Sequence, residues 1–432
     1  MLALFLPLQS AVQAQEETSK YELGFEQQIR NYSWNNVYDL NAAKNDERLD
    51  VRYRTRVWGQ IALGSNVDLF AGLIEETKQF INPTTPCQFD EIAFENLYLD
   101  FRKLLVNGLS LRIGRQNIFR GEGFVIQKGT SNDGSRTQYF NAFDLSYARK
   151  QSRLEIIGIL QPYKDRLLPV IHDRSRILVE WDEQALGAYY TDSNFKSTKF
   201  EAYYFYKKEF RDRRADTDYQ FQPDRHIHTV GGRIVRQIPG DWEADGELAT
   251  QWGAQHPSIP VRGYAGYGYV KKRWNSKWAP VLSAGYFGMS GDNPGSKNKV
   301  EGWDPLFSRY IKWSGSDLYV LTLQHERGYA YWTNMGMWRA QFELAPLKML
   351  TTRFTYYHMN AFHPFAGNSE IFGAGTHRGN LYQARVEVKV NSHWKSYMVY
   401  ERFLPGNFYA GRSPANFLLL VLSFNAVARH AS

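Results

Sequence analysis

Three arginines alternate with other residues in the segment 50–61. Arg52, Arg54 and Arg56 share one face of an extended strand, whereas Tyr53 and Val57 lie on the opposite face. Guanidinium groups stay charged at any relevant pH and bind carboxylates through two parallel hydrogen bonds. Rings or stripes of such groups are a means of passing anions. Because an arginine facing lipid costs roughly 2–4 kcal/mol near the membrane midplane, we expect this stripe to face a polar interior.

The same two-faced pattern recurs along the chain. In the segment 379–390, Val386 and Val388 alternate with Arg385 and Glu387, which is the period-2 signature of a half-apolar strand. We expect inward-facing arginines on strands, and loop arginines that can fold inward, at pore-lining, substrate-binding positions. The strand positions are Arg52, Arg54, Arg56, Arg102, Arg112, Arg353, Arg385 and Arg402, and the loop positions are Arg115, Arg120 and Arg136.

Short and long connections alternate between these segments. The short ones are Ala62–Asn66, Lys103–Gly108, Lys150–Ser152, Ser193–Ser197, Gln237–Asp241, Lys271–Trp278, Ala345–Leu347 and Asn391–His393. Tight turns on one rim and longer loops on the other are typical of bacterial outer-membrane barrels, with the turns in the periplasm. The segments therefore predict an all-β fold, a transmembrane antiparallel β-barrel of about eighteen strands in the bacterial outer membrane. The loop Phe119–Phe140 is glycine-rich and basic, and we expect it to fold inward and narrow the channel.

Composition supports one barrel domain. Of 432 residues, 16% are aromatic, and no charge block or Ser/Pro-rich linker divides the chain. No apolar run approaches the ~18 residues of a membrane-spanning helix. Residues 1–14 are apolar and end in a small-residue pattern, so we interpret them as the remnant of a signal peptide. We assign residues 15–425 to the barrel and 426–432 to a C-terminal tail. The single cysteine, Cys87, excludes an intrachain disulfide.

Other function classes find less support. His226 and His228 share a strand face but lack an evident third ligand, so we expect no metal and no cofactor. No Gly-x-Ser-x-Gly elbow is present, so we expect no catalytic residues and no enzyme. The net charge of +8 is interleaved with aromatics, but these follow the period of lipid-facing strands, which argues against a nucleic-acid binder. Basic residues near a rim would instead contact membrane lipids and lipopolysaccharide.

Two motifs resemble a known family. The stretch Leu111–Gln116 (LRIGRQ), followed by Gly121–Gly123 (GEG), resembles the RxGRQ…G(D/E)G stretch of the bacterial alginate-export porins. The tripeptide Ser290–Asp292, followed by Trp303–Phe307, is similar to that family's SGD…FxPLF loop. The resemblance covers roughly residues 21–425. It implies an eighteen-stranded barrel with an arginine-rich pore through which an anionic uronate polymer leaves the cell.

Three functional hypotheses remain open. The first is export of an anionic, alginate-like polysaccharide by a monomer that would act with periplasmic export components. The second is a general or anion-selective porin for small acidic solutes. The third is a structural or adhesive barrel closed by its loops, which a lumen of evenly mixed charge would favour.

Overall fold

A computed structural model describes most of the chain. The described residues are 21–44, 46–127, 139–179, 181–210, 224–308, 331–367 and 369–430, together with Leu318, Tyr319, Thr322 and Glu326. Within this part of the chain, no helix is both long and apolar enough to cross a membrane.

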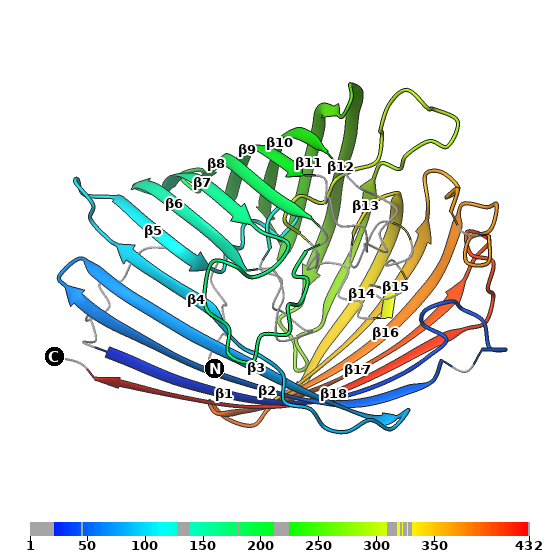
Figure 1. The fold of residues 1–432 in the computed structure, drawn as a ribbon, viewed down its shortest axis with the longest axis horizontal. Coiled ribbons are helices and arrows are strands. Elements are labelled where there is room, and N and C mark those ends of the chain that lie inside the picture. The colour runs from blue at the N-terminus through cyan, green and yellow to red at the C-terminus, as the bar shows by residue number, and fades with distance from the viewer. Residues whose placement is uncertain are drawn as a thin grey trace.

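Eighteen antiparallel strands close into a barrel, in which β1 and β18 lie side by side (Figure 1). Each strand pairs with its neighbours in the sequence, and pairing of β1 with both β2 and β18 leaves no free sheet edge. The strands are β1 Tyr21–Asn35, β2 Arg48–Gly64, β3 Val67–Asn82, β4 Ile92–Phe101, β5 Leu109–Gln116, β6 Phe140–Arg149, β7 Ser152–Gln161, β8 Asp182–Asp192, β9 Thr198–Phe210, β10 Arg225–Ile238, β11 Trp242–Gln255, β12 Ile259–Arg273, β13 Val281–Met289, β14 Met335–Leu347, β15 Leu350–Asn360, β16 His377–Lys389, β17 Trp394–Pro405 and β18 Ala415–His430. The predicted fold class and strand number are confirmed.

The two faces of each strand follow the alternation of the sequence. On β2 the side chains of Tyr53, Val57 and Ile61 are exposed on the outer face, while Arg52 and Arg54 point inward and are buried. An apolar outer face and a polar inner face suit a wall with lipid outside and a lumen inside.

All eight predicted tight turns lie on one rim, which we call the turn rim. Because every strand is antiparallel to the next, Ala62–Asn66 and Gln237–Asp241 fall on the same rim, as expected. The opposite rim, which we call the loop rim, carries the longer connections, including residues 117–139, 162–181 and 290–334.

The last strand extends beyond the expected boundary at residue 425. Strand β18 continues to His430, and its residues Ala426–His430 pair with Tyr21–Phe25 of β1. Residues 426–430 are therefore wall and not tail. The long first strand supplies the partner backbone that keeps this extension in the sheet.

Two segments of the loop rim fold into the barrel and pack against each other. Phe124 stacks on Trp303 with ring centroids 5.6 Å apart, and it meets Tyr267 of the wall edge to face at 5.5 Å. The backbones of Ile126 and Phe307 form a parallel bridge. Residues of the two segments, 117–127 and 300–308, lie in one hydrophobic cluster with inward aromatic side chains of β8, β9, β12 and β13.

Candidate functional site: the barrel lumen

Near the loop rim, the arginines of β1 and β2 form a closed cluster. Arg30 of β1 lies directly opposite Arg52 of β2, and Arg54 follows two residues further along β2. We call these three residues the upper arginine cluster. Arg52 and Arg54 are only 5% and 2% exposed, and Arg30 is fully buried.

Carboxylates surround the upper arginine cluster. The Arg52 Nε atom lies 2.7 Å from Asp50 Oδ2, and Arg30 forms an ion pair with Glu76 of β3. Arg52 also lies over the ring of Tyr32 at 4.1 Å. Buried charges persist only when they are paired in this way, so this part of the predicted stripe is a structural salt-bridge network.

Towards the turn rim, other predicted arginines point inward and are partly exposed. Arg56 lies between Glu26 and Glu95, at 3.1 Å from each carboxylate. Arg112 contacts Asp100 at 2.5 Å and lies over the ring of Tyr98. Directly after the end of β4, Arg102 contacts Asp68 at 3.2 Å.

Arg353 and Arg385 form an open pair of inward arginines. They are direct cross-strand partners on β15 and β16, so their Cβ atoms lie about 5 Å apart. Their side chains are 32% and 24% exposed. Arg353 contacts Glu343 at 2.6 Å, and Arg385 contacts Glu387 while lying 4.2 Å from the centre of the Tyr397 ring. We call Arg353 and Arg385 the lower arginine pair.

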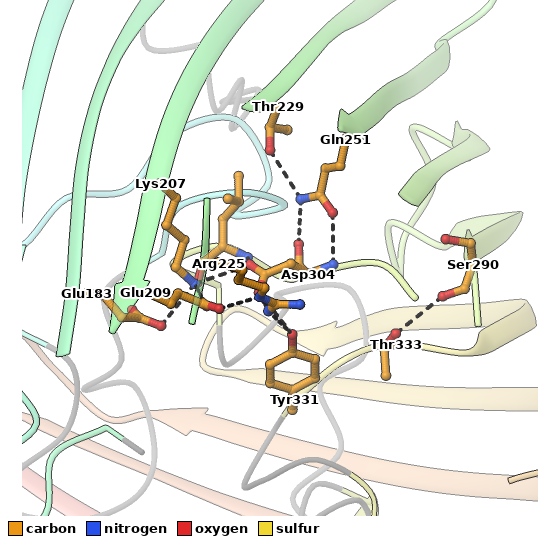
Figure 2. Close-up of polar contacts among 11 residues, drawn as sticks. Glu183, Lys207, Glu209, Arg225, Thr229, Gln251, Ser290, Asp304, Tyr331 and Thr333 are labelled. Atoms are coloured by element: carbon orange, nitrogen blue, oxygen red, sulfur yellow. Dashed lines mark hydrogen bonds and ion pairs between the residues drawn. The ribbon is translucent and has the colours of Figure 1, made fainter. Parts of the chain in front are cut away.

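Asp304 anchors the segment 300–308 to the wall (Figure 2). Lys207 and Arg225, on the inner faces of β9 and β10, both contact its carboxylate, and the Tyr331 hydroxyl donates a hydrogen bond to Asp304 Oδ2 at 2.9 Å. Gln251 of β11 binds the backbone of Asp304 on both sides, at 2.8 and 2.9 Å. Lys207 also pairs with Glu183 and Glu209. All these charges are buried, so the segment is fixed to the wall and narrows the lumen.

Arg120 lies inside the barrel, as expected for the loop Phe119–Phe140. Its guanidinium contacts Asp144 of β6 and Glu155 of β7, at 2.6 Å each. Burial lowers the pKa of Arg120, but the two carboxylates outweigh this and hold the pKa above its usual value. The described part of this loop, up to Gln127, therefore folds inward as predicted. Arg136 lies outside the described residues.

The prediction that Arg402 faces the lumen is wrong. On β17 the buried side chains are Val399, Glu401 and Phe403, and Arg402 is exposed on the outer face. Two consecutive charged residues cannot share a face of a strand, and Glu401 takes the inner one. Arg402 lies three residues from the end of β17, where a long side chain can reach the membrane surface.

The inward placement of Arg115 is also wrong. Arg115 shares the outer face of β5 with Ile113, and its cross-strand partners are Leu97 and Asn141. Its guanidinium forms a two-pronged ion pair with Asp165 of the connection 162–181, at 2.6 and 2.7 Å. A loop folded back over the outer wall therefore neutralises this arginine, which period-2 reading of the strand alone would place in contact with lipid.

Several inward cations were missed from the sequence. They include Lys207 and the arginines Arg30, Arg225, Arg233, Arg339 and Arg378. The signal was present for Arg339, because Arg339, Gln341 and Glu343 alternate with the outward Trp338, Ala340 and Phe342. Arg378 had no such signal, since its partner Glu326, at 2.6 Å, comes from the long connection 290–334.

His226 and His228 lie on the outer face among aromatic side chains. The Tyr204 hydroxyl and His228 Nδ1 are 2.7 Å apart, and Trp252 stacks on His228 with centroids 5.4 Å apart. Among the residues that the structure describes, no group of three or more potential ligands could hold a metal ion. The pair belongs to an aromatic patch near the loop rim, the position of an interfacial belt in such barrels.

Comparisons with known proteins agree with this geometry. A family model described as alginate export matches residues 19–417. No curated protein sequence matches the chain. Among solved structures, OpdQ of Pseudomonas aeruginosa superposes with a TM-score of 0.59 at 11% identity, covering 95% of this chain and 100% of that one. OccK7 (OpdD) of the same organism gives 0.57 at 13% identity, covering 95% and 100%. OccK2 (OpdF), solved in complex with glucuronate, gives 0.56 at 12% identity, covering 94% and 98%. At such low identity the three structures show a shared barrel fold.

Proposed function

Because the chain belongs to the alginate export family, we propose that it exports an anionic, uronate-type polysaccharide through its lumen. The protein is an outer-membrane β-barrel of porin-like architecture. The proposal concerns the substrate and the direction of its passage.

The lower arginine pair is the observation that carries the proposal. Like charges directly opposite each other destabilise a sheet, yet Arg353 and Arg385 are cross-strand partners in an accessible part of the lumen. A carboxylate that binds between the two guanidinium groups would relieve their repulsion and could accept a hydrogen bond from each. Uronate sugars carry one such carboxylate on every residue.

The position of the lower arginine pair fits a substrate that enters from the turn rim. Arg353 is three residues from the start of β15 and Arg385 is four from the end of β16, both at that rim, which corresponds to about 10–13 Å along the strand. Glu343 and Glu387 partly neutralise the pair. Such partial neutralisation keeps binding weak, and transport requires sites that release the solute as well as bind it.

Arg56 and Arg112 extend the set of partly exposed lumen arginines on β2 and β5. A flexible polyanion would exchange its carboxylates among such sites, each of them shared with a wall carboxylate. This arrangement replaces the continuous Arg52–Arg56 stripe as the proposed path, because Arg52 and Arg54 are buried.

A porin for small acidic solutes is the second candidate. It is favoured by the segments 117–127 and 300–308, which are fixed inside the barrel and narrow the lumen. A narrow lumen would admit a single sugar acid more readily than a polymer.

Planar-bilayer recording separates the two candidates. We expect oligouronates to block the wild-type current more strongly than neutral oligosaccharides of equal length, and block to strengthen with chain length. In the double variant R353Q/R385Q, uronate block should weaken about tenfold, as expected for two partly exposed charge contacts of up to about 1 kcal/mol each.

Arg166, an exposed arginine of the connection 162–181 that pairs with Asp182 of β8, provides the matched control. Oligouronates should block the current of R166Q as strongly as that of the wild type. Equal block by a monomeric uronate and a long oligouronate would favour the small-solute porin. Block that the double variant leaves unchanged would contradict the proposed site.

A further inference from the structure

Five inward carboxylates lie on strands between β6 and β11 of the barrel and form what we call the acidic wall. They are Asp144 of β6, Glu155 of β7, Glu201 of β9, and Asp245 and Glu247 of β11, and all are buried. Three cations of the same wall pair with part of this set. They are Arg153 with Glu155 at 2.9 Å, Lys199 with Glu201 at 2.6 Å, and Arg233 with Glu201 and Asp245 at 2.8 and 2.5 Å.

Arg120 supplies a further cation from outside the wall. Its guanidinium reaches across Asp144 and Glu155, with contacts of 2.6 Å to each carboxylate and a second bond of 2.8 Å to Glu155. Within the described part of the chain, Arg120 is the salt-bridge partner of Asp144. Because Glu155 also has Arg153, loss of Arg120 would leave Asp144 without a salt bridge. Arg153 and Arg112, the cross-strand neighbour of Asp144, would be the remaining nearby cations.

The backbone around Arg120 holds it in this position. Gly121 has a φ of +60°, and a Cβ added there would lie 3.2 Å from the Tyr189 hydroxyl and 3.3 Å from the Glu201 carboxylate. Glu122 then pairs with Arg233 at 3.3 Å. A glycine is needed for both the positive φ and the close approach to the wall.

The inward segment 300–308 packs against the side of residues 117–127 that faces away from the acidic wall. The amide of Phe307 donates to the carbonyl oxygen of Val125 at 3.0 Å, and the amide of Gln127 donates to the carbonyl oxygen of Phe307 at 3.1 Å. Ser308 donates to the carbonyl oxygen of Gly123. Residues 117–127 are thus held between the acidic wall and residues 300–308, so Arg120 cannot swing away without breaking these bonds.

We propose that Arg120 is a charge-selectivity residue of the channel, which masks Asp144 and Glu155 of the acidic wall and is held over them by the segment 117–127. Without it, the carboxylates would attract inorganic cations and repel an anionic solute passing the opposite wall. The inference rests on the channel of the proposed function and is independent of its substrate.

Reversal potentials in a KCl gradient test this role directly. In R120Q the ratio of potassium to chloride permeability should rise about fivefold, the factor expected for one exposed carboxylate about 4 Å from an ion in water. Retention of the folded barrel in each variant is checked by its heat-modifiable migration on gels.

A charge-matched second variant separates masking from direct anion binding by Arg120. In R120Q/D144N the uncovered carboxylate is also removed, so the permeability ratio should return to the wild-type value. R166Q, in the outer connection, should leave the ratio unchanged.

An unchanged ratio in folded R120Q would overturn the proposal. A ratio that stays shifted in R120Q/D144N would also overturn it, because Arg120 would then act by binding anions itself. These readouts use no saccharide, so failure of uronate block in the R353Q/R385Q experiment leaves this test unaffected.

Discussion

The upper arginine cluster and the lower arginine pair contain the same chemical group in opposite environments. Arg30 and Arg52 are cross-strand partners near the loop rim, and Arg353 and Arg385 are cross-strand partners near the turn rim. The first two are buried among Asp50 and Glu76. The second two are a quarter to a third exposed and pair with the partly exposed carboxylates of Glu343 and Glu387.

This difference separates structural from solute-binding arginines. A buried pair has lost its water and depends on its carboxylates for stability, whereas a partly exposed pair can exchange a wall carboxylate for a carboxylate of the solute. Arginine count alone therefore says little about selectivity. What matters is whether each guanidinium can be reached from the lumen and whether its partner can be displaced.

The largest effect that we expect from changing one of these arginines is on the free energy of unfolding. R52Q removes a buried cation and leaves Asp50, which is fully buried, without its partner at 2.7 Å. We expect the variant to lose about 3–5 kcal/mol in the free energy of unfolding, the range for breaking a buried ion pair. Urea unfolding in detergent micelles, followed by tryptophan fluorescence, measures this loss.

R353Q is the matched change in the lower pair, and it should cost less than about 1 kcal/mol because the ion pair with Glu343 is partly exposed. Equal losses in the two variants would show that the two regions do not differ in the way described.

A smaller effect is expected when the partner of a lower arginine is removed. Glu387 is 44% exposed and pairs with Arg385, whose side chain is also partly exposed to the lumen. E387Q frees that guanidinium and removes a negative charge, so uronate oligomers should block the current about two- to fivefold more strongly, the equivalent of up to about 1 kcal/mol for an exposed pair. The measurement is the concentration for half-maximal block in planar bilayers, and weaker block in E387Q would count against solute exchange at Arg385.

Much of the fold follows from local patterns. Period-2 alternation and tight turns fix a strand's faces and ends because lipid tolerates few charges and requires all backbone groups to be paired. These rules predicted the strand number, the turn rim and the inward positions of Arg52, Arg353 and Arg385.

The site was harder to predict because burial inside the lumen depends on the loops. Asp304 forms an ion pair with Arg225, which lies 79 positions earlier in the chain. No local pattern in β2 indicates that Arg52 and Arg54 are covered, and none in β5 indicates that Asp165 covers Arg115 on the outer wall. The error at Arg402 had a different origin, since Glu401 and Arg402 competed for one inward position.

The smallest effect is expected at Arg402, which serves as a test of the inward–outward assignment. Its side chain lies on the outer face with Met398 and Tyr400 and donates a long hydrogen bond of 3.4 Å to Asn416. R402Q should therefore leave the reversal potential and the uronate block within experimental error of wild type, and an exposed residue of this kind changes stability by no more than about 0.5 kcal/mol. The same bilayer recordings used for R353Q/R385Q provide the measurement. A clear loss of uronate block in R402Q would place Arg402 in the conduction path and reverse the faces assigned to β17, because Glu401 and Phe403 would then have to face lipid.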